Sequence, residues 1–394
     1  MPHFDTIVLG LGALGSAALY HLASAGQKVL GVDRFAPPHP YGSTHGDTRI
    51  TRLAIGEGVE YTPFALRSHE LWREIEGETG ADLLTSCGGL IISNRGERPV
   101  SRGVPDFFDN TLAAARRYGI AHEVLDAREI RRRFPQLNVQ SHEVGYYEPE
   151  AGFLRVEECV RAQLELARRR GATIRIDETV EGFESTANSA TITTRDGTYS
   201  ADHLLIAAGA WLPKLVGPPL ADLFRVTRQV LHWFEIQSAL EAFSPGRFPI
   251  FIWELPDRPQ PIYGFPTVGM GGLAPSIKVA TEQSIATVDP DHVQRSVAPE
   301  EIAEMYARYV APYLPGLGPR SVRTAVCMYT EAPGGRFVID THPDHPRVTF
   351  ASACSGHGFK HSPALGEALA QRLTVGTSRL DLEPFSLASL RERS

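Results

Sequence analysis

Residues 7–33 constrain the fold more than any other part of the chain. Apolar residues 7–9 lead into the glycine turn GLGALG at residues 10–15, a helical run follows, and apolar residues 29–32 lead to Asp33. Glycines at such a turn let the backbone approach a pyrophosphate, which then lies at the helix N-terminus. An acid about 20 residues further on accepts hydrogen bonds from a ribose. The order strand, glycine turn, helix, strand and acid therefore predicts a dinucleotide-binding unit, for either NAD(P) or FAD.

The composition is that of a globular protein. The chain has 394 residues, 42% hydrophobic and 22% charged, which suits about two domains. Its net charge of -7 argues against nucleic acid or an anionic membrane as the main partner. We find neither a run of about 18 apolar residues nor a charged-then-apolar leader, so we expect no membrane span and no secretion signal.

The cysteines carry no metal or disulfide pattern. Cys87, Cys159, Cys327 and Cys354 are scattered, without the spacing of zinc ligands. We therefore expect no metal site, and a reduced, cytoplasmic location.

Residues 37–52 combine prolines with cations. The prolines at 37–40 forbid helix and predict an extended crossing over the ligand. If the later part is helical, Arg49 and Arg52 share one face. The two arginines then either clamp a carboxylate or offset charge on a flavin ring, or they form ordinary salt bridges with Asp47 or Glu57 on a solvated face. The residues alone leave both interpretations open.

The rest of the chain mixes helical and strand patterns. We expect helices at residues 62–78, 107–118, 126–134, 157–170, 299–313 and 362–372. We expect strands at residues 88–92, 173–176, 191–194, 203–208, 230–236, 250–254, 262–266, 277–280, 322–330, 337–340 and 348–351, and a hairpin turn at Asp196 and Gly197. The aromatic-rich residues 224–319 predict a second sheet, after which the chain returns to the first domain.

Two lysines stand out in this pattern. Lys278 lies inside an apolar strand, where it either snorkels to solvent or forms a desolvated cation in a cleft. Lys360 ends the glycine loop at residues 355–360, just before the last long helix. Such a loop presents backbone N–H groups to an anionic or carbonyl edge.

Later features favour a flavin. A strand ends at Ala208-Gly209, a glycine loop starts the last helix, and a strand-rich stretch separates them. The sequence here resembles the FAD-dependent amine oxidases of the monomeric sarcosine oxidase family, which includes N-methyltryptophan oxidase and pipecolate oxidase. The resemblance covers nearly the whole chain, and its specific pieces are Gly42-Ser43-Thr44-His45-Gly46-Asp47-Thr48-Arg49, Ala208-Gly209-Ala210-Trp211, Cys327-Met328-Tyr329-Thr330 and Ser355-Gly356-His357-Gly358-Phe359-Lys360.

The resemblance implies an α/β fold of two domains (α+β). One is a glutathione-reductase-type, Rossmann-like FAD-binding domain, which we expect at residues 1–85, 145–222 and 320–394. The other is a substrate-binding domain with a mixed or antiparallel sheet, which we expect at residues 86–144 and 223–319.

The resemblance also implies where FAD binds. Cys327 is similar to the family's site of covalent flavin attachment, whereas by itself it reads as a small apolar residue packed in a strand. The residues expected to bind FAD are Gly10, Gly12, Ala13, Leu14, Gly15, Asp33, Arg34, Ser43, Thr44, Arg49, Arg52, Val180, Ala208, Gly209, Trp211, Cys327, Met328, Gly356, Gly358, Phe359 and Lys360.

Further residues match the family's catalytic and substrate positions. The expected catalytic residues are Lys278, Arg49 and His45, all near the flavin ring. Arg52 and Lys360 are similar to the pair that binds the substrate carboxylate, while Tyr263 and Tyr329 line the pocket.

The implied activity is oxidation of a secondary amino acid, a sarcosine-like N-substituted glycine. Hydride transfer to flavin yields an imine that water hydrolyses, and O2 reoxidises the flavin with release of H2O2. The partners are then an amino-acid substrate and O2, and we expect a monomer. The alternatives are a glycine or primary amino acid oxidase, a flavin amine dehydrogenase that does not use O2, an NAD-dependent dehydrogenase, and a flavin-binding subunit without turnover. Arg52 with Lys360 argues against the last.

The sequence departs from the family near Lys278. The turn at residues 271–276 holds a few extra residues, and Glu282 stands where sarcosine oxidases often have a histidine. Both differences concern the substrate side and favour a larger N-substituent than the methyl group of sarcosine. In the alternative interpretation, Glu282 simply faces solvent.

Overall fold

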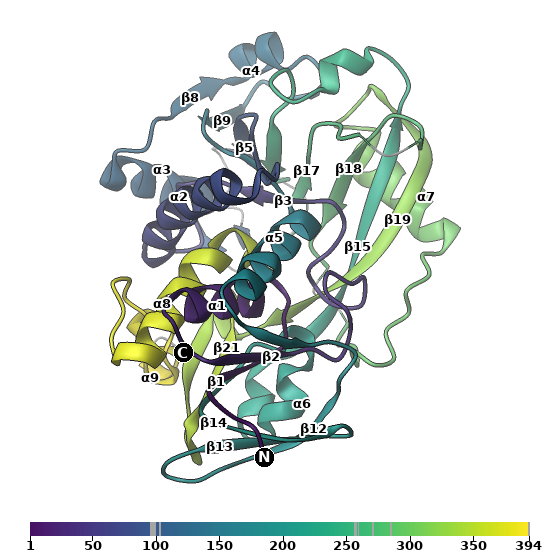
Figure 1. Ribbon diagram of the computed structural model, residues 1–394. Helices are drawn as coiled ribbons and strands as arrows, with labels where there is room; N and C mark the ends of the chain where they lie inside the picture. The colour runs from purple at the N-terminus through teal and green to yellow at the C-terminus, as the bar shows by residue number, and fades with distance from the viewer. Residues whose placement is uncertain are drawn as a thin grey trace.

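The glycine motif folds as the sequence predicts. The structure is a computed structural model that describes residues 1–94, 100–101, 104–255, 258, 260–269, 272–283 and 286–392. Strands β1 (His3–Leu9) and β2 (Val29–Val32) pair in parallel, and helix α1 (Ala13–Ser24) connects them (Figure 1). Gly10 has a φ of 91°, and a Cβ atom there would lie 2.7 Å from the carbonyl oxygen of Ala207. Only glycine fits at this turn.

The first large sheet gathers strands from distant parts of the chain. The further strands are β11 (Thr173–Arg175), β12 (Val180–Ser185), β13 (Ala190–Thr194), β14 (Gly197–Ile206), β20 (Val338–His342) and β21 (His345–Ser352). The order is β11-β2-β1-β14-β13-β12, with β21 beside β14 and β20 beside β21. Thr194 pairs with Gly197, which confirms the predicted hairpin. β14 runs parallel to β1, so the middle of the chain completes the unit that the N-terminus begins.

Three helices pack together on this sheet. They are α1, α5 (Val156–Arg169) and α8 (Ser362–Val375), and they share one apolar core (Figure 1). A Cβ atom on Gly366 would lie 2.6 Å from the Cβ of Ala17, so α8 crosses α1 closely. The predicted return of the C-terminal part to the first unit is therefore confirmed.

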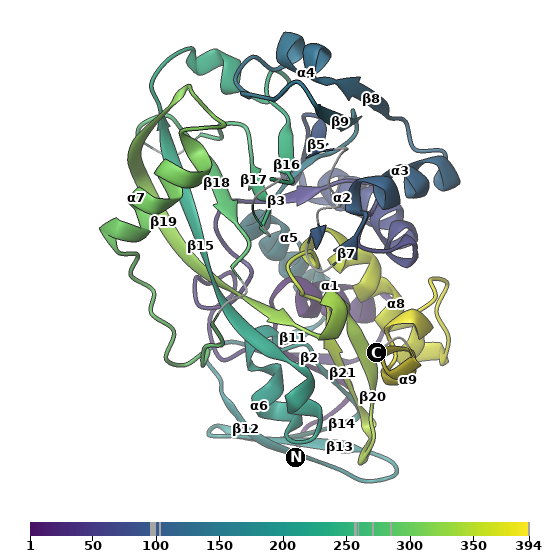
Figure 2. The ribbon, with the colours of Figure 1, turned by 180° about the vertical axis from the view of Figure 1, so that it is seen from behind.

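The second large sheet is mixed. Its strands, in spatial order, are β19 (Leu317–Glu331), β15 (Arg225–Ile236), β18 (Ser276–Thr281), β17 (Ile262–Gly264), β16 (Ile250–Trp253), β5 (Gly89–Asn94), β9 (Glu143–Glu148) and β8 (Glu123–Asp126). β16 pairs with β5 in parallel, and the other pairs are antiparallel. Figure 2 shows β15 and β19 side by side along their length. Residues 320–331 thus lie in this sheet, and the division into domains remains a prediction.

The remaining α-helices and strands lie outside the two large sheets. They are α2 (Thr62–Thr79), α3 (Phe107–Tyr118), α4 (Ala127–Arg133), α6 (Leu212–Val216), α7 (Pro299–Met305), α9 (Leu387–Glu392), β3 (Thr48–Thr51), β4 (Leu84–Ser86), β6 (Val100–Ser101), β7 (Val104–Pro105) and β10 (Gly152–Arg155). The predicted turn at residues 269–272 lies partly outside the described residues, since 270 and 271 are not described.

The interpretation of residues 44–52 as a helix is wrong. Residues 48–51 form β3, which pairs antiparallel with β10 so that Arg49 lies opposite Leu154 and Thr51 opposite Gly152. Threonine and isoleucine suit a strand because their side chains branch at Cβ. The partner strand lies about a hundred residues further along the sequence, so the local pattern did not reveal the pairing.

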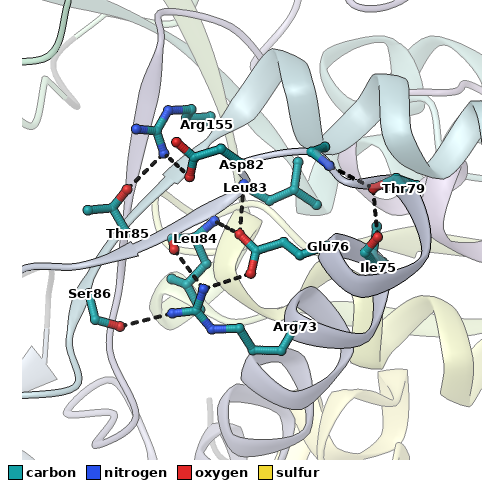
Figure 3. A network of polar contacts seen from close by, with 11 residues as sticks. Arg73, Ile75, Glu76, Thr79, Asp82, Leu83, Leu84, Thr85, Ser86 and Arg155 are labelled. Carbon is teal, nitrogen blue, oxygen red and sulfur yellow. Dashed lines mark hydrogen bonds and ion pairs between the residues drawn. The ribbon is translucent and has the colours of Figure 1, made fainter.

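A polar network fastens α2 to the small sheet that contains β3 (Figure 3). Glu76 Oε1 accepts hydrogen bonds from the backbone N–H groups of Leu83 and Leu84, at 2.8 and 2.9 Å. Arg73 donates to Glu76 at 2.6 Å and to the carbonyl oxygen of Leu84 at 2.9 Å. These bonds fix the end of α2 against β4.

Candidate active site

A cavity of about 420 Å³ is lined by residues of both large sheets. The predicted site residues that line it are Gly10, Gly12, Ala13, Leu14, Asp33, Arg34, Ser43, Thr44, Arg49, Arg52, Val180, Ala208, Gly209, Trp211, Tyr263, Tyr329, Gly356, Gly358, Phe359 and Lys360. The predicted residues outside the lining are Gly15, His45, Lys278, Cys327 and Met328. The structure thus brings residues 10–14 and 356–360 to one space.

One end of the cavity is suited to a phosphate and a ribose. Helix α1 has no acid in its first turn, and its N-cap, Gly12, has no side chain that could cap the helix. Its first N–H groups therefore offer positive partial charge to a phosphate. Asp33 is 6% exposed and accepts hydrogen bonds from the backbone of Leu11 at 2.7 Å and of Phe35 at 2.8 Å. Burial raises the pKa of this carboxyl, while the two hydrogen bonds act in the opposite direction.

Residues 287–298, which we call the rim segment, reach the cavity through Asp291. Asp291 accepts hydrogen bonds from Trp211 Nε1 at 2.8 Å, from Arg34 at 2.5 Å and from Lys214 Nζ at 2.6 Å. Trp211, Arg34 and Lys214 also line the cavity. The rim segment is therefore held to this end of the site by charge.

The other end holds two buried cations around one carboxylate. Arg52 is 2% exposed and donates to Glu57 and to the carbonyl oxygen of Ala54. Lys360 Nζ lies 3.8 Å from Glu57 Oε1 and donates to the carbonyl oxygen of His357 at 2.9 Å. The predicted salt bridge between Arg52 and Glu57 exists, but it is buried in the cavity wall and does not lie on a solvated helix.

Arg49 and two tyrosines line the cavity between the sheets. Arg49 donates to the carbonyl oxygens of Ser43 at 2.7 Å and of Thr48 at 2.9 Å, and it pairs with neither Asp47 nor Glu57 in a described salt bridge. The hydroxyl oxygens of Tyr263 and Tyr329 are 3.5 Å apart.

Lys278 is a desolvated cation and does not snorkel. It is 3% exposed, and its Nζ donates to the carbonyl oxygens of Gly46 at 2.8 Å and of Thr48 at 2.5 Å. Burial drives the pKa of Lys278 well below its ordinary value. Its Nζ is 4.1 Å from the ring centre of Phe265, which lines the cavity, so Lys278 lies one side chain behind the wall.

The turn that faces Lys278 is held in an unusual conformation. Gly46 and Asp47 have φ angles of 92° and 68°. Glu157 accepts the N–H of Gly46 at 2.7 Å, and Arg323 binds both carboxylate oxygens of Asp47 at 2.9 and 2.8 Å. These contacts aim two carbonyl groups at one ammonium group.

Cys327 and His45 are buried close to these cations. Burial raises the pKa of the Cys327 thiol, while the charges of Arg49 and Lys278 act in the opposite direction. Burial, together with the charge of Arg49, lowers the pKa of His45 to about 3, so its ring is neutral at pH 7.

Sequence reasoning missed several residues of the cavity. Glu57 was considered only as a surface salt-bridge partner, and the lining residues Lys214, Asp291 and Cys354 were not singled out. For Glu57 a signal was available, since an acid five residues after Arg52 is within reach of its side chain. For Asp291 there was none, because its partners come from two distant segments, one with Arg34 and one with Trp211 and Lys214.

With this geometry in place, comparison with known proteins identifies the family. Residues 5–372 match the family described as FAD dependent oxidoreductase. The chain belongs to this family. The monomeric sarcosine oxidases of Streptomyces avermitilis and of Bacillus sp. strain B-0618 are each 40% identical to it, over 96% and 98% of this chain and 95% and 96% of theirs. N-methyl-L-tryptophan oxidase of Yersinia pestis is 33% identical over 98% of this chain and 100% of its own.

Solved structures confirm the fold of this FAD dependent oxidoreductase. NikD, an unusual amino acid oxidase essential for nikkomycin biosynthesis, superposes with a TM-score of 0.82 at 22% identity over 98% of each chain. Glycine oxidase from Geobacillus kaustophilus gives a TM-score of 0.74 at 18% identity over 98% of this chain and 99% of its own. The predicted fold class, a Rossmann-like FAD-binding unit with a second sheet, is confirmed. Within the described residues, no helix is both long and apolar enough to span a membrane.

The cavity fits the cofactor of the family. The open N-terminus of α1 suits a pyrophosphate, and a side chain at Gly10 would collide with Ala207. Asp33 lies at the end of β2, where a ribose is bound in such motifs. FAD would thus be held by the glycine turn and Asp33 at one end, with Arg49 and Lys278 near the other.

Proposed function

We propose that this oxidoreductase is an oxidase of a secondary amino acid, a sarcosine-like N-substituted glycine, that releases H2O2. The observation that carries the proposal is the buried pair Arg52 and Lys360 in the wall of the same cavity as the glycine turn. Paired cations of this kind bind a carboxylate and fix its orientation. The relatives named monomeric sarcosine oxidase and N-methyl-L-tryptophan oxidase support this substrate class.

Arg52 and Lys360 orient the substrate. Both already share one carboxylate, that of Glu57, so their positions suit a second carboxylate brought by the substrate. Holding the carboxylate fixes the C–H bond next to nitrogen relative to the cofactor. When bound, FAD supplies the acceptor for the hydride equivalent and the path of electrons to O2.

Arg49 and Lys278 have electrostatic tasks. A cation that lines the cavity, such as Arg49, favours negative charge on the cofactor side. Lys278 is shielded from water, and a buried cation stabilises the negative charge that develops on dioxygen. We assign His45 to the flavin side as a neutral ring, and Tyr263 and Tyr329 to the substrate pocket.

We also propose that Cys327 attaches the flavin covalently. The thiol lies on β19 with Arg49 and Lys278 close enough to oppose the effect of burial on its pKa. Cations near a cysteine favour the reactive thiolate.

The experiment that tests the activity is an anaerobic titration of the yellow protein with sarcosine, glycine, proline, pipecolate and bulkier N-alkyl glycines. We expect N-alkyl glycines to bleach the flavin absorbance and the bleached protein to produce H2O2 in air. Bleaching by glycine alone would favour the primary amino acid oxidase. Bleaching without peroxide on exposure to air would favour a dehydrogenase.

We propose further that the protein is a cytoplasmic monomer. Its scattered cysteines suit a reducing compartment, and relatives that match it over almost their whole length are named monomeric. We retain the domains at residues 1–85, 145–222 and 320–394, and at 86–144 and 223–319, as part of this proposal.

A further inference from the structure

Glu282 is held in a fixed place at the end of β18, the strand that carries Lys278. The next residue, Gln283, donates its backbone N–H to Gln229 Oε1 at 2.8 Å, and Gln229 Nε2 donates back to the carbonyl oxygen of Gln283. Gln229 is 1% exposed and lies in β15. These two hydrogen bonds to a buried side-chain amide fix the backbone beside Glu282, so Glu282 is not part of a free surface loop.

The carboxylate of Glu282 lies against the cavity wall. Its Oε1 is buried and lies 3.4 Å from the point where a Cβ atom of Gly356 would be. The ring of Tyr329 lies 3.0 Å from the same point. Gly356, Tyr329 and Tyr263 all line the cavity. Burial raises the pKa of Tyr263 to about 12, and the negative charge of Glu282 acts in the same direction.

This part of the wall is opposite in charge to the carboxylate clamp. Arg52 and Lys360 line the cavity with positive charge, whereas here Tyr263 and Tyr329 line it, and the carboxylate of Glu282 lies next to Gly356, just outside the lining. Gly356 and Lys360 are four residues apart on one loop, so at most about 14 Å of chain separates them. A small molecule bound at Lys360 therefore lies near Gly356, the lining residue next to Glu282.

We propose that Glu282 determines substrate specificity by binding a protonated amino group at the end of the substrate's N-substituent. The inference rests on the proposed function, because the substrate carboxylate is taken to lie on Arg52 and Lys360. A partly buried carboxylate gains most from a ligand that brings the opposite charge and N–H donors. The preferred substrate is then an N-(aminoalkyl)glycine, and sarcosine is a poor one.

Two thioether acids test this proposal, since sulfur in place of the amine nitrogen prevents oxidation. They are (2-aminoethylthio)acetate and (propylthio)acetate, which have similar length and differ in the terminal charge. Binding to the FAD-loaded protein is followed by the change in the flavin absorption spectrum. We expect the wild-type protein to bind the aminated acid at least about tenfold more tightly, as for a charge-assisted hydrogen bond in a cleft.

The variant Glu282→Gln should lose this preference and still bind (propylthio)acetate within about twofold of wild type. The exposed Glu300→Gln is the matched control and should keep the preference. Equal affinity of the two acids for the wild-type protein would overturn the inference without any variant, as would a preference that survives Glu282→Gln. Failure of both acids to bind the wild-type protein would instead refute the carboxylate clamp of the proposed function.

Discussion

Lys360 Nζ lies 3.8 Å from Glu57 Oε1, and both side chains are almost fully buried, at 5% and 3% exposure. Glu57 also accepts a hydrogen bond from Arg52, so one carboxylate compensates two cations. We expect Glu57→Gln to lower the free energy of unfolding by about 3 kcal/mol, because it removes the buried negative charge that Arg52 and Lys360 share. Urea denaturation measures this loss, and added acetate should restore part of it. An unchanged free energy of unfolding would contradict the central role of Glu57.

The carboxylate clamp predicts the effect of removing either cation. Arg52→Gln or Lys360→Gln should raise the amino acid concentration needed for half-maximal anaerobic reduction by about 10- to 100-fold, as expected for a lost charged hydrogen bond. Stopped-flow absorbance of the flavin measures the rate of reduction at each amino acid concentration. Arg308→Gln is the control, because Arg308 is exposed and pairs only with Glu304 in the described salt bridges. Unchanged saturation would place the carboxylate elsewhere.

Lys278 should affect the reaction with oxygen more than the reaction with substrate. We expect Lys278→Met to slow reoxidation by about 100-fold or more and to change anaerobic reduction much less. Because burial lowers the pKa of Lys278, its charge is lost at a lower pH than that of an ordinary lysine. The wild-type reoxidation rate should therefore fall as the pH rises through this lowered pKa. If Lys278→Met slowed reduction by substrate and reoxidation by oxygen equally, Lys278 would have no specific role in the reaction with oxygen.

Covalent attachment of the flavin to Cys327 can be tested by precipitating the protein with acid. After precipitation with acid, we expect the yellow colour to stay with the wild-type polypeptide and to appear in the supernatant for Cys327→Ser. Cys354→Ser is the control, because Cys354 also lies at the cavity but is not the predicted attachment site. Colour that leaves the wild-type protein would refute the thioether and leave the fold assignment untouched.

Glu76 links pH to stability. Backbone hydrogen bonds from Leu84 and Leu83 and the pairing with Arg73 outweigh burial and lower its pKa in the folded protein. The ionised form is thus favoured by folding, so its contribution is present above the unfolded pKa and is lost as the pH falls through the folded pKa. We expect Glu76→Gln to cost about 1–3 kcal/mol at pH 7 and much less in acid. Glu70→Gln, which is exposed, should cost little at either pH.

Local sequence patterns were sufficient to predict the residues at the nucleotide end of the site. Gly10 and Asp33 follow from a motif within one stretch of about 30 residues, where backbone geometry dictates residue type. The catalytic end could not be predicted in the same way. Arg49 lies in a strand only because β10 pairs with it, and Glu57 meets Lys360 from 303 positions away. Such contacts depend on how the sheets assemble, and no local period encodes them.

The resemblance to a family identified some residues of the catalytic end that local patterns did not, but it did not explain all of them. It identified Lys278 as a site residue. No sequence pattern predicts that Lys278 donates to the carbonyl oxygens of Gly46 and Thr48. It could not say what Glu282 does, because that position departs from the family, and only its place next to Gly356 puts its carboxylate beside the cavity.

The crossing of α8 over α1 has a consequence for biosynthesis. Residues 10–14 of the cavity lining leave the ribosome early, whereas the lining residues at 351–360 are translated more than 300 residues later. A nascent chain therefore has no complete cavity until residues 351–360 have been synthesised. Capture of the flavin must therefore wait for these residues, and a chain truncated before β21 should be made without colour.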